Sequence, residues 1–185
     1  MAEQPQTPSQ SKSTLLVVDD SPDIHRLMRA RLRSDDMDVA AASGGAEALQ
    51  AARTSPPAVL LLDIDMPGMD GYEVLRAFKE DKALQHIPII MLSGKQSVQD
   101  KVTAFDLGAV DYVTKPFDFT ELRVRVRSVL RIQQLLQMLE QRAQIDGLTG
   151  LWNRAFFDQR WTEEVSRCAR HGHPLAVAIV DIDHF

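Results

Sequence analysis

Carboxylates follow two of the apolar runs in this sequence. Asp63 comes directly after residues 59–62, and the adjacent pair Asp19 and Asp20 follows residues 15–18. An unbroken apolar run that ends at polar residues is typical of a strand buried on both faces of a parallel sheet. Because the carboxyl ends of such strands meet at one edge, where ligands bind in open α/β sheets, we expect chemistry there. A structural alternative, in which Asp63 only caps the following turn, stays open.

Carboxylates gathered in this way suit a divalent cation. Two like charges about 4 Å apart repel by roughly 4 kcal/mol at an effective dielectric of 20. Mg²⁺, which prefers oxygen ligands and keeps several waters, would relieve this repulsion. Ser93 and Lys115 end two further apolar runs at the same predicted edge. A carboxylate nucleophile, a metal, a cation and a hydroxyl donor together describe a site for a phosphoryl group.

Alternating strands and helices are predicted to bring these groups together. The strands are predicted at residues 14–18, 38–42, 59–62, 87–92 and 110–114. The helices between them are predicted from apolar residues at helical spacing: Ile24, Leu27, Met28 and Leu32; Ala46, Leu49 and Ala52; Tyr72, Leu75 and Phe78; and Val98, Val102 and Phe105. Strict alternation predicts an α/β fold, a doubly wound, five-stranded parallel sheet with helices on both faces.

The last helix is predicted to extend beyond this domain. Its apolar residues step by three or four: Leu122, Val126, Val129, Ile132, Leu136, Leu139 and Ala143. Such a seam is typical of a coiled coil, so we expect a homodimer through residues 122–143. Two successive steps of three, from Val126 to Ile132, are predicted to mark where packing inside the domain gives way to the coiled coil. One long surface helix without a partner is the alternative.

Composition argues against several classes of partner. The net charge of −5 argues against nucleic acid. The longest apolar runs are far shorter than the roughly 20 residues that span a bilayer, so no membrane partner is expected. The single cysteine, Cys168, excludes an internal disulfide and favours a cytoplasmic location. Residues 1–13 are rich in Gln, Ser and Pro and are predicted to be a disordered leader.

Four motifs together resemble the flavodoxin-like receiver domain of two-component response regulators. They are Val-Val-Asp-Asp at 17–20, Leu-Asp-Ile-Asp-Met-Pro-Gly-Met-Asp-Gly at 62–71, Leu-Ser-Gly at 92–94, and Gly-Ala-Val-Asp-Tyr-Val-Thr-Lys-Pro-Phe at 108–117. The resemblance covers about residues 15–131. It implies a switch in which Asp63 accepts a phosphoryl group from a sensor histidine kinase or a phosphotransfer protein.

The same resemblance assigns further roles to residues at the predicted edge. It implies that Mg²⁺ is held by Asp19, Asp20, Asp63 and the backbone carbonyl of Asp65. Lys115 would bind the phosphate, and Ser93 and Tyr112 would be the switch pair. The bond between Lys115 and Pro116 is expected to be cis, as it usually is in the family.

A second resemblance is to the GGDEF family, the diguanylate cyclases that make cyclic di-GMP from GTP. It rests on Asp-Gly-Leu-Thr-Gly-Leu-Trp-Asn-Arg at 146–154 and on Asp-Ile-Asp-His-Phe at 181–185. In the family Asp181 would bind Mg²⁺ with a second acid of the signature hairpin. The printed sequence has no such hairpin, so Asp181 is interpreted as a vestigial metal ligand. A helix at 155–170 and a strand at 175–180 are predicted here.

These resemblances divide the chain into four parts. They are a leader at 1–13, a receiver at 14–131, a helical stalk at 132–145 and an incomplete α/β fragment of a GGDEF domain at 146–185. One helix and one strand cannot bury a core, so we expect the fragment to be poorly ordered or to borrow contacts from a neighbouring chain. The chain itself is expected to make no cyclic di-GMP, whereas a longer parent would be a diguanylate cyclase.

Three other functions are alternatives to this interpretation. A haloacid-dehalogenase-like phosphatase would use Asp63 as the nucleophile and Asp65 as its acid partner. Position 67 is Pro, where that motif has Thr or Val, and Asp19 and Asp20 would have no role. An active cyclase and a dimerising scaffold that is never phosphorylated are the remaining alternatives.

Overall fold

The structure is a computed structural model that describes residues 13–34, 37–94, 97–146 and 148–180. The predicted leader, apart from its last residue, and Asp181 lie outside the described residues. The chain divides into two compact units, residues 1–132 and residues 133–185.

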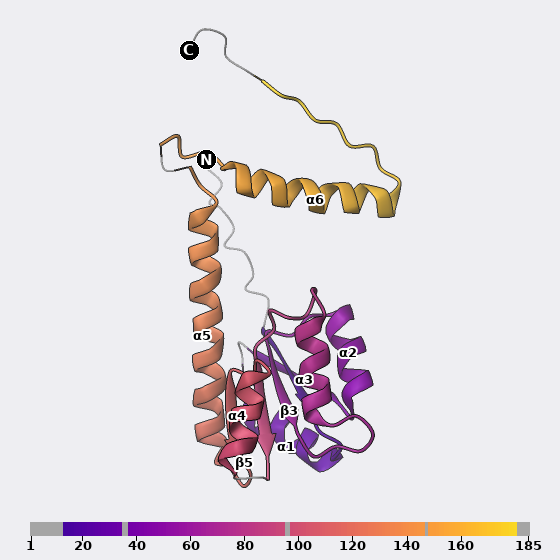
Figure 1. The fold of residues 1–185 in the computed structure, drawn as a ribbon, viewed down its shortest axis with the longest axis vertical. Helices are drawn as coiled ribbons and strands as arrows, with labels where there is room; N and C mark the ends of the chain where they lie inside the picture. Colours follow the sequence, from indigo (N-terminus) through magenta and orange to yellow (C-terminus); the bar gives the residue numbers. More distant parts are fainter. Residues whose placement is uncertain (1–12, 35–36, 95–96, 147, 181–185) are drawn as a thin grey trace, which may run out of the picture. The chain divides into compact units, whose positions relative to one another are not determined.

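The described part of the first unit contains a five-stranded parallel sheet in the order β2-β1-β3-β4-β5. Figure 1 shows β3 and β5 of this sheet among the helices of the unit. The strands are β1 (Ser13–Val18), β2 (Met37–Ala42), β3 (Val59–Asp63), β4 (Ile89–Ser93) and β5 (Asp111–Thr114). This order confirms the predicted doubly wound sheet. The chain reverses its direction of winding between β1 and β3, and such a reversal opens a crevice at the carboxyl ends of the two strands.

Helices cover both faces of the sheet. They are α1 (Pro22–Leu32), α2 (Gly45–Thr54), α3 (Gly71–Glu80), α4 (Val98–Asp106) and α5 (Phe119–Ala143). One core cluster joins the sheet to α2, α3 and α4, and a second joins it to α1 and α5. Every residue of β3 is buried, because this central strand has a helical layer on each side.

Local sequence explains why these elements begin where they do. Pro22 is the first residue of α1, where its missing N–H is not needed. Asp70 and Glu73 form a reciprocal capping box at the start of α3. The Ser97 side chain caps α4 by accepting from the N–H of Asp100. Polar residues next to the carboxyl ends of the strands therefore start the helices that flank the sheet edge.

The prediction for α4 was wrong about its buried face. Val98, Val102 and Phe105 are 77%, 44% and 48% exposed. Among the residues of α4, all of which are described, only Ala104 is buried. The small side chain of Ala104 lets α4 pack on the sheet without burying the larger apolar residues of the helix. Apolar spacing in the sequence does not show which of these residues contacts the sheet.

Smaller corrections concern other element boundaries and faces. Ala46 of α2 is exposed, and Ala48 and Ala52 are buried instead. β4 begins at Ile89 and not at residue 87, because Pro88 has no N–H to donate to the sheet. Val110 is 47% exposed and precedes β5.

Helix α5 changes its environment along its length. Leu122 and Val126 are fully buried in the core of the first unit, and Val129 and Leu130 are partly buried against it. The larger apolar residues that follow are exposed: Ile132, Leu135, Leu136, Met138 and Leu139. The change falls at the predicted step from Val126 to Ile132. No helix among the described residues is both long enough and apolar enough to cross a membrane.

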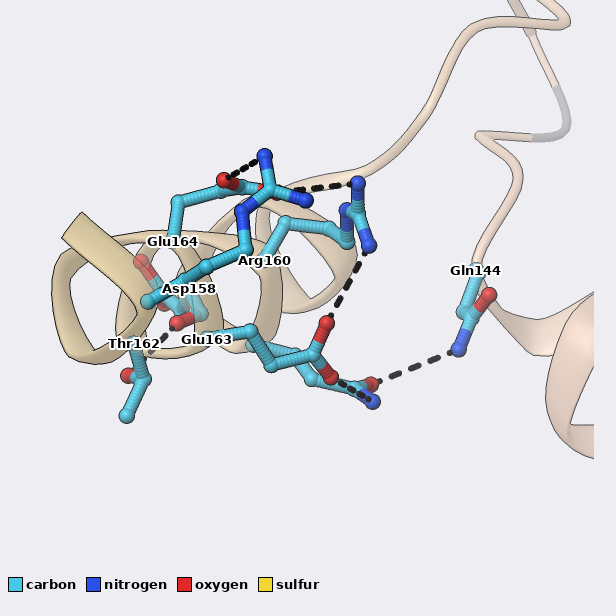
Figure 2. A network of polar contacts seen from close by, with 8 residues as sticks. Gln144, Asp158, Arg160, Thr162, Glu163 and Glu164 are labelled. Carbon is cyan, nitrogen blue, oxygen red and sulfur yellow. Dashed lines mark hydrogen bonds and ion pairs between the residues drawn. The ribbon is translucent and has the colours of Figure 1, made fainter. Parts of the chain in front are cut away.

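The second unit contains α6 (Arg154–His171), which confirms the predicted helix. Ion pairs of Arg160 with Glu163 and Glu164 line its surface, and Gln144 donates to Gln159 (Figure 2). The predicted strand at 175–180 is wrong, because residues 173–180 have no regular structure. Residues 133–180, as far as they are described, offer no strand with which this segment could pair.

Replacing Gly71 with Ala is expected to lower the free energy of unfolding by about 1–3 kcal/mol. A Cβ at Gly71 would lie 2.3 Å from the carbonyl oxygen of Asp63 and 2.7 Å from Cα of Ile64, so backbone must shift. Urea unfolding followed by circular dichroism measures the loss. Gly44→Ala is the matched control, because its Cβ meets nothing within 4 Å. Equal losses in the two variants would contradict the argument.

Candidate functional site

Three carboxylates meet at the sheet edge beside β1 and β3. Asp19, Asp20 and Asp63 each offer an oxygen, and these oxygens lie within 4.8 Å of one another. Asp19 and Asp63 are only 1% and 5% exposed, whereas Asp20 is exposed. Asp19 is held in place because its Oδ1 accepts from the N–H of Ser21 at 2.9 Å. The predicted convergence of the three acids is therefore present.

Lys115 reaches two of these acids from the end of β5. Its Nζ lies 3.0 Å from Oδ2 of Asp19 and 2.9 Å from Oδ2 of Asp63. Its backbone N–H donates to the carbonyl of Ser93 at 2.6 Å, which ties the end of β5 to the end of β4. The peptide bond between Lys115 and Pro116 is cis, as expected.

Burial dominates the electrostatics of Asp63. It raises the pKa of the Asp63 carboxyl, Lys115 opposes this shift, and the nearby charge of Asp19 adds to it. Burial alone would lower the pKa of Lys115, but its hydrogen bonds to Asp63 and Asp19 outweigh burial and raise it. Lys115 therefore stays charged at neutral pH and partly compensates a carboxylate that has little access to water.

One oxygen of Asp63 is left without a partner. Oδ2 contacts Lys115, but the buried Oδ1 has no hydrogen-bond partner among the described residues. A buried carboxylate oxygen that receives no hydrogen bond destabilises a folded protein. Oδ1 therefore suits a cation or a covalent bond at this position.

The remaining predicted residues lie on β4, on β5 and after β3. Ser93 is fully buried at the end of β4, and its register partner on β5 is Thr114. Tyr112 lies on β5 and is 7% exposed. Asp65 is exposed, and its backbone N–H lowers the pKa of the Asp63 carboxyl.

Tyr72 contributes to this region in a way that the sequence analysis did not anticipate. We assigned it to the apolar face of its helix, but its hydroxyl donates to the carbonyl of Asp100 at 3.2 Å. Burial, with smaller effects from Tyr112 and nearby acids, raises the pKa of Tyr72 to about 12. The available signal was the phenol itself, since a partly buried tyrosine hydroxyl usually has a hydrogen-bond partner.

Comparison with known sequence families gives two matches. The family described as "Response regulator receiver domain" matches residues 15–127. The family described as "Diguanylate cyclase, GGDEF domain" matches residues 143–185.

Two curated relatives align with a large part of this chain. The response regulator PleD of Caulobacter vibrioides is 36% identical over 150 residues, which cover 74% of this chain and 33% of PleD. The probable transcriptional regulator ycf27 of Porphyra purpurea is 42% identical over 120 residues, which cover 65% of this chain and 48% of the relative. The chain thus spans between a third and about half the length of these two relatives.

Solved structures agree with the fold of the first unit. The chemotaxis protein CheY4 of Vibrio cholerae has a TM-score of 0.61 at 29% identity, covering 64% of this chain and 99% of that chain. The receiver domain of the Francisella response regulator 1452 has a TM-score of 0.62 at 30% identity, with 66% and 99% covered.

The family match and the solved structures do not support the phosphatase alternative. The receiver family accounts for residues 15–127, including Asp19 and Asp20, for which the phosphatase has no role. The chain therefore belongs to the response regulator receiver domain family of two-component signalling switches, and its receiver domain is followed by a GGDEF region.

Proposed function

We propose that Asp63 is the residue that accepts the phosphoryl group, from a phosphohistidine of a sensor kinase or phosphotransfer protein. The observation that supports this proposal is the difference in bonding partners between the two carboxylate oxygens of Asp63. Oδ2 is held by Lys115 at 2.9 Å, while the buried Oδ1 has no partner among the described residues. One oxygen is thus oriented by a cation, and the other is free of competing hydrogen bonds.

The acids around Asp63 fit Mg²⁺. The proposed ligands are carboxylate oxygens of Asp19, Asp20 and Asp63 and the backbone carbonyl of Asp65. The fit rests on carboxylate oxygens that lie within 4.8 Å of one another and on the unpartnered Oδ1. When bound, Mg²⁺ supplies positive charge that neutralises the carboxylates and the transferred phosphoryl oxygens.

The transfer itself needs little from the protein beyond positioning and charge. A carboxylate oxygen of Asp63 forms a bond to phosphorus, the bond from phosphorus to the imidazole nitrogen breaks, and the histidine keeps that electron pair. The product is an aspartyl phosphate and a neutral histidine. The ammonium group of Lys115, already 2.9 Å from Asp63, then forms an ion pair with the new phosphoryl oxygens.

The switch follows from the new group. A phosphoryl group adds negative charge and acceptor oxygens, which the hydroxyl of Ser93 satisfies by moving toward it. The ring of Tyr112, already only 7% exposed, moves further inward into the space that Ser93 leaves. Ser93 ends β4, and Tyr112 is the second residue of β5, the neighbouring strand that pairs with β4 in parallel register.

Asp63→Asn is expected to abolish phosphorylation by acetyl phosphate and Mg²⁺, because an amide is not a nucleophile for this transfer. Intact-protein mass spectrometry measures the added phosphoryl group. Asp65→Asn is the matched control, since the proposal uses only the backbone of Asp65, and it should retain labelling. Stoichiometric labelling of Asp63→Asn would refute the assignment. Repeated turnover of a phosphate ester would instead favour an enzyme.

Asp63→Asn is also expected to raise the free energy of unfolding at neutral pH without Mg²⁺. The pKa of Asp63 is raised above the ordinary 3.8, so the folded chain holds this proton more tightly than the unfolded chain. Well below pH 3.8 the Asp63 carboxyl is protonated in the folded and in the unfolded chain, so its ionisation does not change the free energy of unfolding. As pH rises through the raised pKa, the native chain loses stability, and the neutral amide avoids this loss.

Urea unfolding of the native chain and of Asp63→Asn across the acid-to-neutral range measures this difference. Added Mg²⁺ should stabilise the native chain more than the variant, because the metal neutralises the charge that the variant lacks. A native chain that is the more stable of the two at neutral pH without Mg²⁺ would show that burial does not dominate at Asp63.

We also propose that the receiver controls a diguanylate cyclase output. This rests on the GGDEF match at residues 143–185, which begins at the last residue of α5. The role of Asp181 and the expectation that these 185 residues make no cyclic di-GMP rest on the sequence alone. The boundaries proposed for the parts are those of the sequence analysis, with the stalk at 132–145.

The exposed part of α5 is proposed to form the dimer. Introducing Glu at both Leu136 and Leu139 is expected to convert a dimer to a monomer, because the apolar side chains that would pair become charged. Multi-angle light scattering measures the mass with beryllofluoride and Mg²⁺ present. Gln134→Glu with Gln137→Glu is the matched control and should leave the mass unchanged. A native chain that is monomeric at high concentration would rule the dimer out.

A further inference from the structure

Helix α4 is weakly anchored to the receiver. Its buried residue is Ala104, near its C-terminal end, while Val98, Val102 and Phe105 are exposed. Burial of a single alanine methyl group contributes little to holding a helix in place. The described contacts of its first turns are mainly polar.

Polar contacts of Asp100 and Lys101 join the first turns of α4 to the rest of the receiver. The hydroxyl of Tyr72, on α3, donates to the backbone carbonyl of Asp100 at 3.2 Å. Nζ of Lys101 lies 5.9 Å from the centroid of the Tyr112 ring. The residue proposed to turn inward during switching therefore contacts α4 directly.

Tyr72 is well placed to hold α4 relative to Asp63. It follows Gly71, whose N–H donates to the carbonyl of Ile64 at 3.0 Å, so the start of α3 is tied to the residue after Asp63. The ring of Tyr72 is partly buried against the core cluster that contains Tyr112. Its pKa of about 12 means that the phenol keeps its proton as a donor at neutral pH.

The connection between β4 and α4 makes this contact relevant to switching. Ser93 ends β4, and Ser97 caps α4, so only a short segment separates the serine proposed to move from the first turn of α4. A displacement of Ser93 toward a phosphoryl group would pull on that turn through this segment. The hydrogen bond from Tyr72 to Asp100 opposes the pull, because its donor is fixed to α3.

We propose that Tyr72 is a positioning residue that latches the first turn of α4 to α3 in the described arrangement and thereby opposes the switch. The proposal rests on the function proposed above. The latch uses the backbone carbonyl of Asp100, so the carboxylate of that residue is not required. Removing the Tyr72 hydroxyl shifts the population toward the switched arrangement before any phosphoryl group is bound.

The first test is the affinity of the full chain for beryllofluoride with saturating Mg²⁺, a mimic of the phosphoryl group. Tyr72→Phe removes the hydroxyl and keeps the ring. Losing one hydrogen bond that favours the unswitched arrangement is expected to tighten apparent binding roughly three- to tenfold. Isothermal titration calorimetry measures this change, and unfolding in urea measures stability separately.

The second test reports on the switch residue itself. The chain has two tyrosines. Tyr72→Phe grown with 3-fluorotyrosine therefore carries a single fluorine label, at Tyr112. Without beryllofluoride, the fluorine resonance of Tyr112 in this variant should move part of the way toward its position in the beryllofluoride complex. A purely structural role for Tyr72 would lower stability without moving this resonance in that direction.

Two controls separate the latch from general effects on α4. Thr103→Val removes a side-chain hydrogen bond within α4, from Thr103 to the carbonyl of Gln99, and should leave the affinity unchanged. Asp100→Asn keeps the accepting carbonyl and should also leave it unchanged. An equal gain in either control, or unchanged or weaker binding by Tyr72→Phe, overturns the latch. If the native chain and Tyr72→Phe both fail to bind beryllofluoride, the proposed function fails, and the latch fails with it.

Discussion

The receiver depends on one constraint, a carboxylate buried at the end of its central strand. Asp63 is 5% exposed, and burial raises its pKa. A charge in such a place must be compensated from elsewhere in the fold, and Lys115 supplies the compensation from β5, two strands away. The parallel sheet makes this contact possible, because it brings the ends of strands that are distant in sequence to one edge.

Stability is distributed unevenly around that edge. β3 and β4 are buried throughout, so the acid and Ser93 sit on rigid elements. Helix α4 has one buried residue and depends on polar contacts from Tyr72 and Lys101. Elements with few buried apolar contacts open most easily, so movement driven from a rigid site is expected to appear in α4 first.

Sequence patterns identified the strands better than the helix faces. Apolar runs predicted the bounds of all five strands to within two residues, because a strand that is buried on both faces is apolar along most of its length. The face of α4 was wrong, because apolar spacing is the same whether Ala104 or Phe105 contacts the sheet. The strand predicted at 175–180 also failed, because pairing depends on neighbours that the described residues do not provide.

The sequence by itself determined the α/β class, the family, and which acids, hydroxyl and ammonium group lie at the sheet edge, because residue types at strand ends are local information. Tertiary structure alone decided how these groups meet. It placed Lys115 on both Asp19 and Asp63, left Oδ1 of Asp63 unpaired among the described residues, and joined Tyr72 to Asp100. Such contacts depend on helix packing and strand order, which join residues far apart in the chain and leave no trace in local spacing.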